Sequence, residues 1–183
     1  MMVLYVFGTV IINTQNILIE GITIKDSPFW TIHPVYSENI TIRNVHIDGT
    51  AINSDGIVID SSRLVLIEDS EIKSGDDAIS IKSGLESDGW RVGKPSEDIL
   101  IRRVSVGEGH AGISFGSEMS GGIHSVIVRD SIFRNTDTGI NIKSLPGRGG
   151  EIRNLWFYHL TFAPVDIGIK INMRYASEAQ TRS

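Results

Sequence analysis

The sequence predicts an all-β protein that folds as one right-handed, single-stranded parallel β-helix, a solenoid of about six coils over residues 1–183. Three observations support this fold class. A short pattern of alternating apolar residues recurs along the chain, β-branched residues dominate it, and helical periodicity is absent. Connections between parallel strands of one sheet are almost always right-handed, which gives the expected hand of the coil.

The first part of each coil follows one pattern: two apolar residues around a third residue, two polar or small residues, then another apolar pair. If the central apolar residues are equivalent, successive coils step by 23, 25, 34, 27 and 29 residues. These residues are Ile19, Ile42, Ile67, Ile101, Val128 and Phe157. Asparagine precedes several of these runs and suits a corner, because it tolerates left-handed backbone dihedrals. The positions are Asn16, Asn39 and Asn154.

Each coil also carries a later strand in which apolar residues flank one other residue. The runs are Ile57–Ile59, Ile79–Ile81, Ile113–Phe115, Ile140–Ile142 and Ile167–Ile169. Short strands at this spacing, separated by Gly, Asn, Asp or Ser, are typical of a solenoid whose inward residues stack from coil to coil. A leucine-rich repeat is the main alternative, but the chain lacks the Leu-x-x-Leu-x-Leu signature.

Composition limits the function classes. The 17 basic and 22 acidic residues are interspersed and give a net charge of −5, so the chain has no electrostatic footprint for nucleic acid. No cysteine is present, which excludes disulfides and thiolate metal sites. The apolar start, MMVLYVFGTVII, is too short to span a bilayer and lacks a preceding Lys or Arg. It predicts one or two buried strands, with no convincing signal peptide and no membrane segment.

Two insertions interrupt the repeat, GLESDGWRVGKP after Ser83 and LPGRGG from Leu145 to Gly150. Each follows a lysine that ends a strand, so both loops are expected on the side of the acidic corners described next, where solenoids usually bind ligands. Neither chain end resembles a capping element, so we expect residues 1–183 to form one β-helix domain from the central part of a longer protein.

Two acidic corners point to chemistry. Asp55 lies two residues before Ile57, and Asp77 lies two residues before Ile79, so the two carboxylates stack if those isoleucines are equivalent. Asp76 lies three residues before Ile79, and His110 holds the same place in the next coil. Carboxylates this close cannot all ionise freely, so one pKa should rise while others stay low. Glycoside hydrolysis needs such a pair, an acid for the leaving oxygen and a base for water.

A mostly cationic column is expected at the other end of the later strands. Its members, each one residue after a strand, are Asp60, Lys82, Gly116, Lys143 and Lys170. Lysines here could hold a sugar carboxylate as point charges, and Arg148 in the following loop could add a bidentate contact.

These motifs, in this order, resemble glycoside hydrolase family 28, the polygalacturonases and their relatives, over nearly the whole chain. Asn53-Ser54-Asp55 is similar to the family's Asn-Thr-Asp, Gly75-Asp76-Asp77 to its Gly-Asp-Asp, Gly109-His110 to its Gly-His-Gly, and Asn141-Ile142-Lys143 to its Arg-Ile-Lys. The runs SPFWTIHP, GSEMSGG and PGRGG add to the likeness.

The resemblance implies an inverting hydrolase of pectic chains that needs no metal or other cofactor and is secreted, to the extracellular space or the periplasm. It implies that Asp76 is the general acid, that Asp55 and Asp77 activate water, that His110 supports the acid, and that Lys143 binds the substrate's uronate. The residues alone do not decide which aspartate donates the proton. Asn53, Asn141, Lys82 and Arg148 are further candidates for substrate binding.

The chain departs from the family pattern at two places. Asn141 stands where the family has Arg, which removes a bidentate carboxylate contact and weakens the expectation of unsubstituted galacturonate beside the scissile bond. Ala111 follows His110 where the family has Gly. The long loop after Lys82 suggests an exo-acting enzyme, in which one end of the cleft is blocked.

Two other functions fit the sequence. A uronide lyase on a similar solenoid would need calcium or a Lys or Arg base and would leave an unsaturated product. A non-catalytic carbohydrate-binding solenoid, or an inactive fragment, would not depend on the acid Asp76. The sequence leaves the pectic substrate, endo or exo attack and the oligomeric state open.

Overall fold

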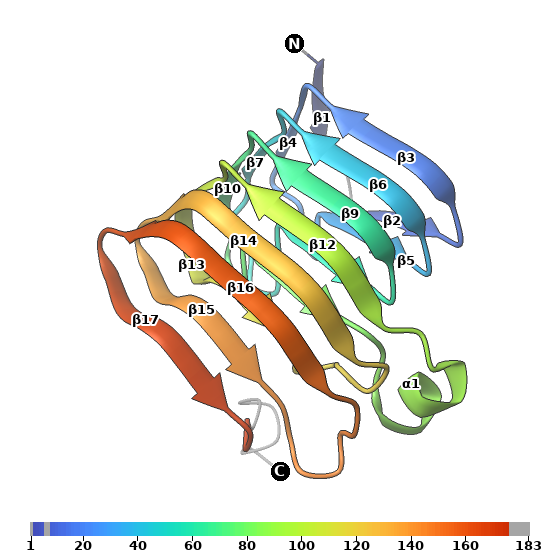
Figure 1. Cartoon of the computed structure of the whole chain (residues 1–183). Coiled ribbons are helices and arrows are strands. Elements are labelled where there is room, and N and C mark those ends of the chain that lie inside the picture. Colours follow the sequence, from blue (N-terminus) through green and yellow to red (C-terminus); the bar gives the residue numbers. More distant parts are fainter. Residues whose placement is uncertain (1, 6–7, 176–183) are drawn as a thin grey trace.

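The structure, a computed structural model that describes residues 2–5 and 8–175, is a parallel β-solenoid (Figure 1). Every pairing between its strands is parallel and joins neighbouring coils. The predicted fold class is therefore confirmed. The repeat pattern differs in one respect: its two apolar pairs form separate strands in different sheets, because residues such as Asn44 and Asp69 have positive φ and turn the chain between them.

Each full coil passes through three sheets. The first contains β3 (Gln15–Glu20), β6 (Glu38–Arg43), β9 (Arg63–Glu68), β12 (Ser96–Arg102), β14 (Ile123–Phe133) and β16 (Ile152–Phe162). The second contains β1 (Met2–Tyr5), β4 (Ile22–Lys25), β7 (His46–Asp48), β10 (Glu71–Lys73), the start of β13 (Ser105–Phe115) and the ends of β14 and β16. The third contains β2 (Thr9–Ile12), β5 (Ile32–Val35), β8 (Ile57–Asp60), β11 (Ile79–Lys82), the end of β13, β15 (Thr136–Lys143) and β17 (Val165–Asn172).

The register of the first sheet agrees with the sequence alignment of the coils. Ile19 pairs with Ile42, and the row continues through the other four predicted positions. The asparagine corners are also confirmed, because Asn16, Asn39 and Asn154 all have φ near the left-handed value. Asn39 Nδ2 donates to Asn16 Oδ1 at 2.6 Å, so these corners stack as the strands do.

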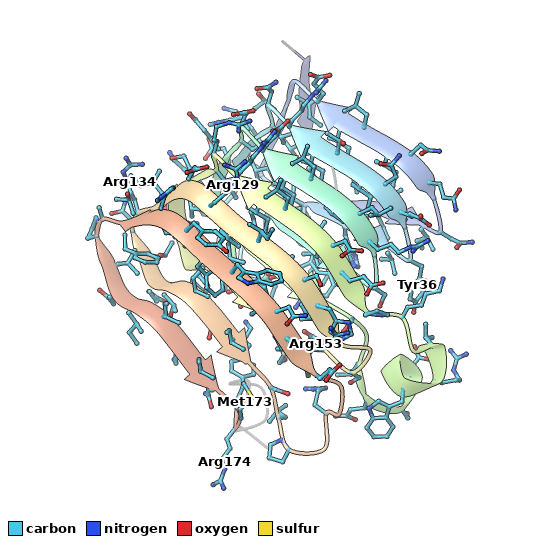
Figure 2. All side chains as sticks on the ribbon, in the orientation of Figure 1. Tyr36, Arg129, Arg134, Arg153, Met173 and Arg174 are labelled. Carbon is cyan, nitrogen blue, oxygen red and sulfur yellow. The ribbon has the colours of Figure 1, made fainter. Side chains whose placement is uncertain are left out.

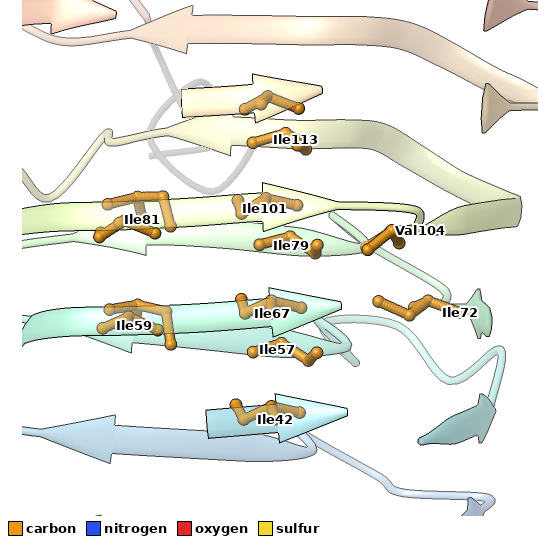
Figure 3. Packing of buried hydrophobic residues seen from close by; sticks show 14 of the residues in the cluster. Ile42, Ile57, Ile59, Ile67, Ile72, Ile79, Ile81, Ile101, Val104 and Ile113 are labelled. Atoms are coloured by element: carbon orange, nitrogen blue, oxygen red, sulfur yellow. The ribbon is translucent and has the colours of Figure 1, made fainter. Parts of the chain in front are cut away.

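The core is a stack of branched aliphatic side chains inside the coil. Ile57, Ile79 and Ile113 pair in register along the third sheet, and Ile42, Ile67 and Ile101 face them from the first (Figure 3). All six are fully buried. Each is worth about 1.5–3 kcal/mol when transferred from water to the core, so burial of this stack supplies much of the driving force for folding. Outward residues such as Arg129, Arg134 and Arg153 lie on the surface (Figure 2).

The N-terminal prediction is partly correct. The segment forms β1 and β2 as expected, but β2 is not a buried strand, because Val10 and Ile12 are more than half exposed. Val10 and Ile12 pair with His33 and Val35 and lie on the outer face, whereas Thr9 and Ile11 pair with the buried Ile32 and Pro34. Met1 and residues 6–7 lie outside the described residues.

The long loop after Ser83 contains a short helix, α1 (Glu86–Val92), that the sequence analysis did not predict. Its 7 residues are too few to show helical periodicity. The helix ends at Gly93, which has the left-handed φ of a helix C-terminus and donates its N–H to the carbonyl of Gly89. Within the described ranges, no helix is long and apolar enough to cross a membrane.

The last predicted strand was placed two residues too early. Ile140 pairs with Ile169, not Ile167, so Lys170 lies beside Asn141 and Asn172 lies beside Lys143. Lys170 is therefore not part of the cationic column. The cause is alternation itself: β17 has apolar residues at every second position, and a pattern of period 2 does not distinguish registers that differ by two residues.

Candidate active site

The two acidic corners meet on the outer face of the third sheet, just before β8 and β11. Gly75 allows the corners to stack closely, because a Cβ at this position would lie 2.6 Å from the carbonyl oxygen of Thr50 in the preceding coil. Ser54 ties the corners together: its Oγ accepts from the N–H of Gly75 at 3.0 Å and donates to the Ala51 carbonyl at 2.6 Å. These contacts fix the positions of the two corners that carry Asp55 and Asp77 relative to each other.

Asp55 and Asp77 flank a single hydroxyl group. Ser80 Oγ donates to Asp55 Oδ2 at 2.7 Å and lies 3.3 Å from Asp77 Oδ2. Both aspartates are 2% exposed, so each carboxylate has lost most of its hydration. The structure therefore brings together the two aspartates that the sequence placed in one column.

A pocket of about 170 Å³ opens over these carboxylates. Six of the predicted site residues line it, namely Asn53, Asp55, Asp76, Asp77, Lys82 and Lys143. Four residues that the sequence analysis did not single out complete the lining: Trp30, Ser117, Glu118 and Tyr175. Trp30 and Glu118 lie within the SPFWTIHP and GSEMSGG runs, so the runs that supported the resemblance contained this signal.

Burial controls the protonation of Asp55. The pKa of Asp55 is raised to about 7, mainly by loss of hydration; repulsion from Asp77 and Asp76 contributes to the rise, while the ammonium of Lys82 and the hydrogen bond from Ser80 oppose it. Asp55 is therefore a group that exchanges its proton near neutral pH.

Asp76 also lines the pocket but is only half-buried, whereas Asp55 is 2% exposed. Desolvation raises the pKa of Asp76, and repulsion from Asp77 adds to the rise, whereas Lys143 and His110 lower it. Burial and the neighbouring carboxylates therefore raise the pKa of both Asp55 and Asp76.

Lys143 neutralises the buried Asp77. Its Nζ donates to Asp77 Oδ2 at 2.8 Å, and its ammonium lies 5.1 Å from the centre of the Tyr175 ring. Desolvation lowers the pKa of Lys143, but attraction to Asp77 outweighs it and leaves the pKa above the ordinary value, so the side chain is cationic. The second oxygen of the carboxylate, Asp77 Oδ1, is buried and receives no hydrogen bond from the described residues.

His110 occupies the predicted place beside Asp76, and its backbone N–H donates to the Asp76 carbonyl at 2.9 Å. The imidazole pairs with a residue that the sequence analysis missed: His110 Nδ1 lies 2.7 Å from Asp137 Oδ2. This contact raises the pKa of His110, desolvation opposes the rise, and attraction to Asp76 adds to it. Asp137 lies three residues before Ile140, as Asp76 and His110 do before their isoleucines, so the spacing could have identified it.

Lys82 is not free to contact a ligand on its own. Its Nζ lies 2.8 Å from Glu118 Oε2 and 4.7 Å from the centre of the Trp30 ring. Attraction to Glu118 and Asp55 raises the pKa of Lys82 above its ordinary value although desolvation lowers it.

Two candidates for substrate binding lie outside the pocket lining. Asn141 is flanked in register by Ser114 and Lys170, and its Oδ1 is buried without a donor among the described residues. Arg148 is also buried, and its Nη1 lies 3.3 Å from Glu86 Oε1.

The two loops that were expected on the side of the acidic corners pack against each other. Trp90 Nε1 of α1 donates to the Arg148 carbonyl at 2.9 Å, and Ser120 Oγ donates to the same oxygen at 2.7 Å. Lys82 and Lys143, at the bases of these loops, both line the pocket. The loops thus leave the solenoid beside the pocket, as predicted.

Fold and site together define a parallel β-helix with a carboxylate-rich pocket on the outer face of one sheet. Residues 8–183 match the sequence model of Glycosyl hydrolases family 28, and the chain belongs to that family. It is 37% identical over 169 residues to a protein of Vitis vinifera named "Probable polygalacturonase", a match that covers 91% of this chain and 34% of the grape protein.

Two solved structures share the fold. The hyperthermoactive exopolygalacturonase of Thermotoga maritima is 42% identical with a TM-score of 0.86, over 89% of this chain and 37% of that one. The family 28 exopolygalacturonase of Yersinia enterocolitica has a TM-score of 0.78 at 23% identity, over 86% of this chain and 28% of that one, which shows the fold alone. The chain spans about a third of the length of these relatives.

Proposed function

We propose that this pocket is the active site of an inverting glycoside hydrolase that cleaves pectic polysaccharide, either polygalacturonan or a related uronide chain. One observation carries the proposal: Asp55, Asp76 and Asp77, from two successive coils of a family 28 chain, line one pocket, and Asp55 and Asp77 flank the same Ser80 hydroxyl. An acid and a base within one pocket are what this hydrolysis requires.

Asp76 is the proposed general acid. A proton donor has to reach the leaving glycosidic oxygen, and Asp76 is the only one of the three aspartates that is not fully buried. Its raised pKa favours the protonated form that the step needs. Its proton passes to the leaving oxygen as the glycosidic bond breaks.

Asp55 and Asp77 are the proposed base that activates water. Asp77 Oδ1 has no donor among the described residues and can accept a hydrogen bond from an attacking water. Asp55, with a pKa of about 7, can accept the proton that the water releases. Asp55 can act as this base only when it is ionised, so activity should rise as pH increases toward about 7.

The proposed substrate contacts follow from which candidate residues line the pocket. Lys143 and Asn53 line the pocket, and we propose that Lys143 binds the uronate carboxylate while it remains paired with Asp77. His110, beside Asp76, favours ionisation of the acid after proton transfer because attraction to its imidazole lowers the pKa of Asp76. Asn141 and Arg148 bind substrate only if a bound chain extends beyond the pocket lining.

Exo action is the finer proposal. The long loop with α1 rises beside the pocket and packs on the loop around Arg148, which places a wall at one side. The Thermotoga maritima relative, at 42% identity, is named as an exopolygalacturonase, which supports the same mode. Because pectic polymers lie outside the cell that degrades them, we also propose an extracellular or periplasmic location.

The test is product analysis. The protein is incubated with oligogalacturonides and, separately, with rhamnogalacturonan, and proton NMR follows the size and anomeric form of the first products. α-Linked substrate should give a β-anomer, and exo attack should release only the smallest product at early times. A mixture of intermediate sizes would indicate endo attack instead.

The same reaction separates the alternatives. An unsaturated, ultraviolet-absorbing product that disappears with a chelator would show a calcium-dependent lyase and contradict the proposal. Binding of oligogalacturonide without any new reducing end would indicate a carbohydrate-binding solenoid. Reducing ends that form equally with and without chelator, and without ultraviolet absorbance, support hydrolysis.

A further inference from the structure

A buried ion pair in the pocket wall has no part in the roles assigned above. Lys82 Nζ lies 2.8 Å from Glu118 Oε2, and the two side chains are 7% and 33% exposed. Lys82 ends β11, whereas Glu118 follows β13 in the next coil. The Glu118 carbonyl accepts from the N–H of Ser83 at 2.9 Å, so the backbone holds the two side chains together.

The ammonium of Lys82 is desolvated and fixed on several sides. The Trp30 ring, from the coil before Asp55, lies 4.7 Å from Nζ and covers it with an aromatic face. Ser96 Oγ donates to the Lys82 carbonyl at 2.6 Å, which holds the end of the strand. A charge held in this way exerts a strong field on its neighbours, because little water screens it.

The nearest consequence falls on Asp55. Ser80 and Lys82 are two residues apart on β11 and project from the same face of the strand. The hydroxyl of Ser80 contacts Asp55. The Lys82 side chain therefore leaves the strand only two residues from the residue that holds Asp55. Attraction to Lys82 is the strongest effect that opposes desolvation at Asp55.

We propose that Lys82 is a positioning residue that sets the ionisation of Asp55, and that Glu118 limits how much of the Lys82 charge Asp55 experiences. We propose this role in place of the sequence-based assignment of Lys82 to a substrate carboxylate. The inference rests on the proposed function for its effect on turnover. Other charged groups surround the pair and Asp55. Asp60 is beside Lys82 in register and 3.6 Å from His33, and Asp76, Asp77 and Lys143 line the same pocket.

Two substitutions should move Asp55 in opposite directions. Lys82→Met keeps the length of the side chain but removes the cation, so the pKa of Asp55 should rise by about one unit or more. Glu118→Gln removes the anion that offsets Lys82, so the pKa of Asp55 should fall. Lys25→Met, an exposed lysine paired only loosely with Asp48 at 4.0 Å, is the matched control and should leave it unchanged.

Two readouts separate this inference from the proposed function. Carboxyl ¹³C NMR of labelled protein titrates Asp55 directly and needs no substrate, with Asp55→Asn to assign the signal. The acidic limb of kcat/KM on oligogalacturonide, which reports ionisation of the base Asp55, should shift in the same directions. Opposite shifts in the titration without any hydrolysis would sustain the coupling and reject the hydrolase.

Three outcomes would overturn the inference. One is a titration of Asp55 that both variants leave unchanged, and another is a shift in the same direction for both. The third is a rise in KM for uronide substrate in Lys82→Met while Asp55 titrates as before, since this shows that Lys82 holds the substrate. If circular dichroism shows Lys82→Met unfolded, Glu118→Gln decides alone, and an absent or upward shift of Asp55 refutes the coupling.

Discussion

Lys143 Nζ and Asp77 Oδ2 lie 2.8 Å apart in a pocket wall where both side chains are almost fully buried. The two residues are 66 positions apart in the chain, and only the stacking of coils brings them together. This ion pair therefore joins the pocket to the fold, because it forms only when β11, β13 and β15 are in register.

Loss of this pair should cost stability as well as activity. Lys143→Met leaves the Asp77 carboxylate buried without its cation, which should lower the free energy of unfolding by about 3–5 kcal/mol. Urea denaturation at pH 7 measures it. The double variant Lys143→Met with Asp77→Asn no longer buries an unpaired charge and should recover a large part of the loss. If the two single losses simply add in the double variant, the pair is not coupled as described.

The raised pKa of Asp55 should appear as a pH dependence of stability. The folded protein holds this proton up to about pH 7, whereas an ordinary aspartate releases it near 3.8, so the folded state binds more protons between these values. The contribution to stability is present below 3.8 and is lost as pH rises through 7. Asp55→Asn removes it, so the variant should gain stability relative to wild type between pH 4 and pH 7.5.

Urea denaturation of both proteins at the two pH values tests this prediction, because all other titrating groups are common to wild type and variant. A stability difference that stays constant with pH would show that Asp55 titrates normally in the folded protein.

Most of the fold could be predicted from the sequence, because period-2 alternation and a repeat of 23 to 34 residues are compatible with few architectures. Ile42, Ile67 and Ile101 pair as aligned because one face of each strand is buried, and a slip of one residue would expose it. The error at Ile167 arose where that constraint is weak: Ile167 and Ile169 are both largely exposed in the last described coil.

The positions of site residues were predictable where those residues follow the repeat. They were not predictable where a residue reaches the pocket from a loop. Asp55, Asp76, Asp77 and His110 hold fixed places before the later strands, so counting residues brought them together. Glu118 and Tyr175 reach the pocket from segments outside any strand, where sequence spacing does not determine position. Arg148 pairs with Glu86 of α1, a helix too short for the sequence to reveal.

Asp76→Asn should abolish hydrolysis without affecting the fold. A general acid contributes about 10²- to 10⁴-fold, so kcat on oligogalacturonide should fall by that factor while KM changes little. Asp166→Asn is the matched control: Asp166 lies three residues before Ile169, in the same column, but is exposed and outside the pocket lining. Initial rates by reducing-end assay suffice. Equal activity of Asp76→Asn and wild type would assign proton donation to another group.

Asp137→Asn should lower activity in one pH window only. Asp137 keeps His110 protonated above its ordinary pKa of about 6.5, and that cation lowers the pKa of Asp76. Both side chains are largely exposed, so the contact is worth about 0.2–1 kcal/mol, a change of up to about fivefold. At pH 5, His110 is protonated in both proteins and kcat/KM should agree. Near pH 7 the variant holds less of the cation than wild type does, so the ratio of variant to wild type should fall below one there. Measuring the ratio across this range, with Asp166→Asn as control, decides: a ratio that is constant with pH means that Asp137 acts on structure and not through His110.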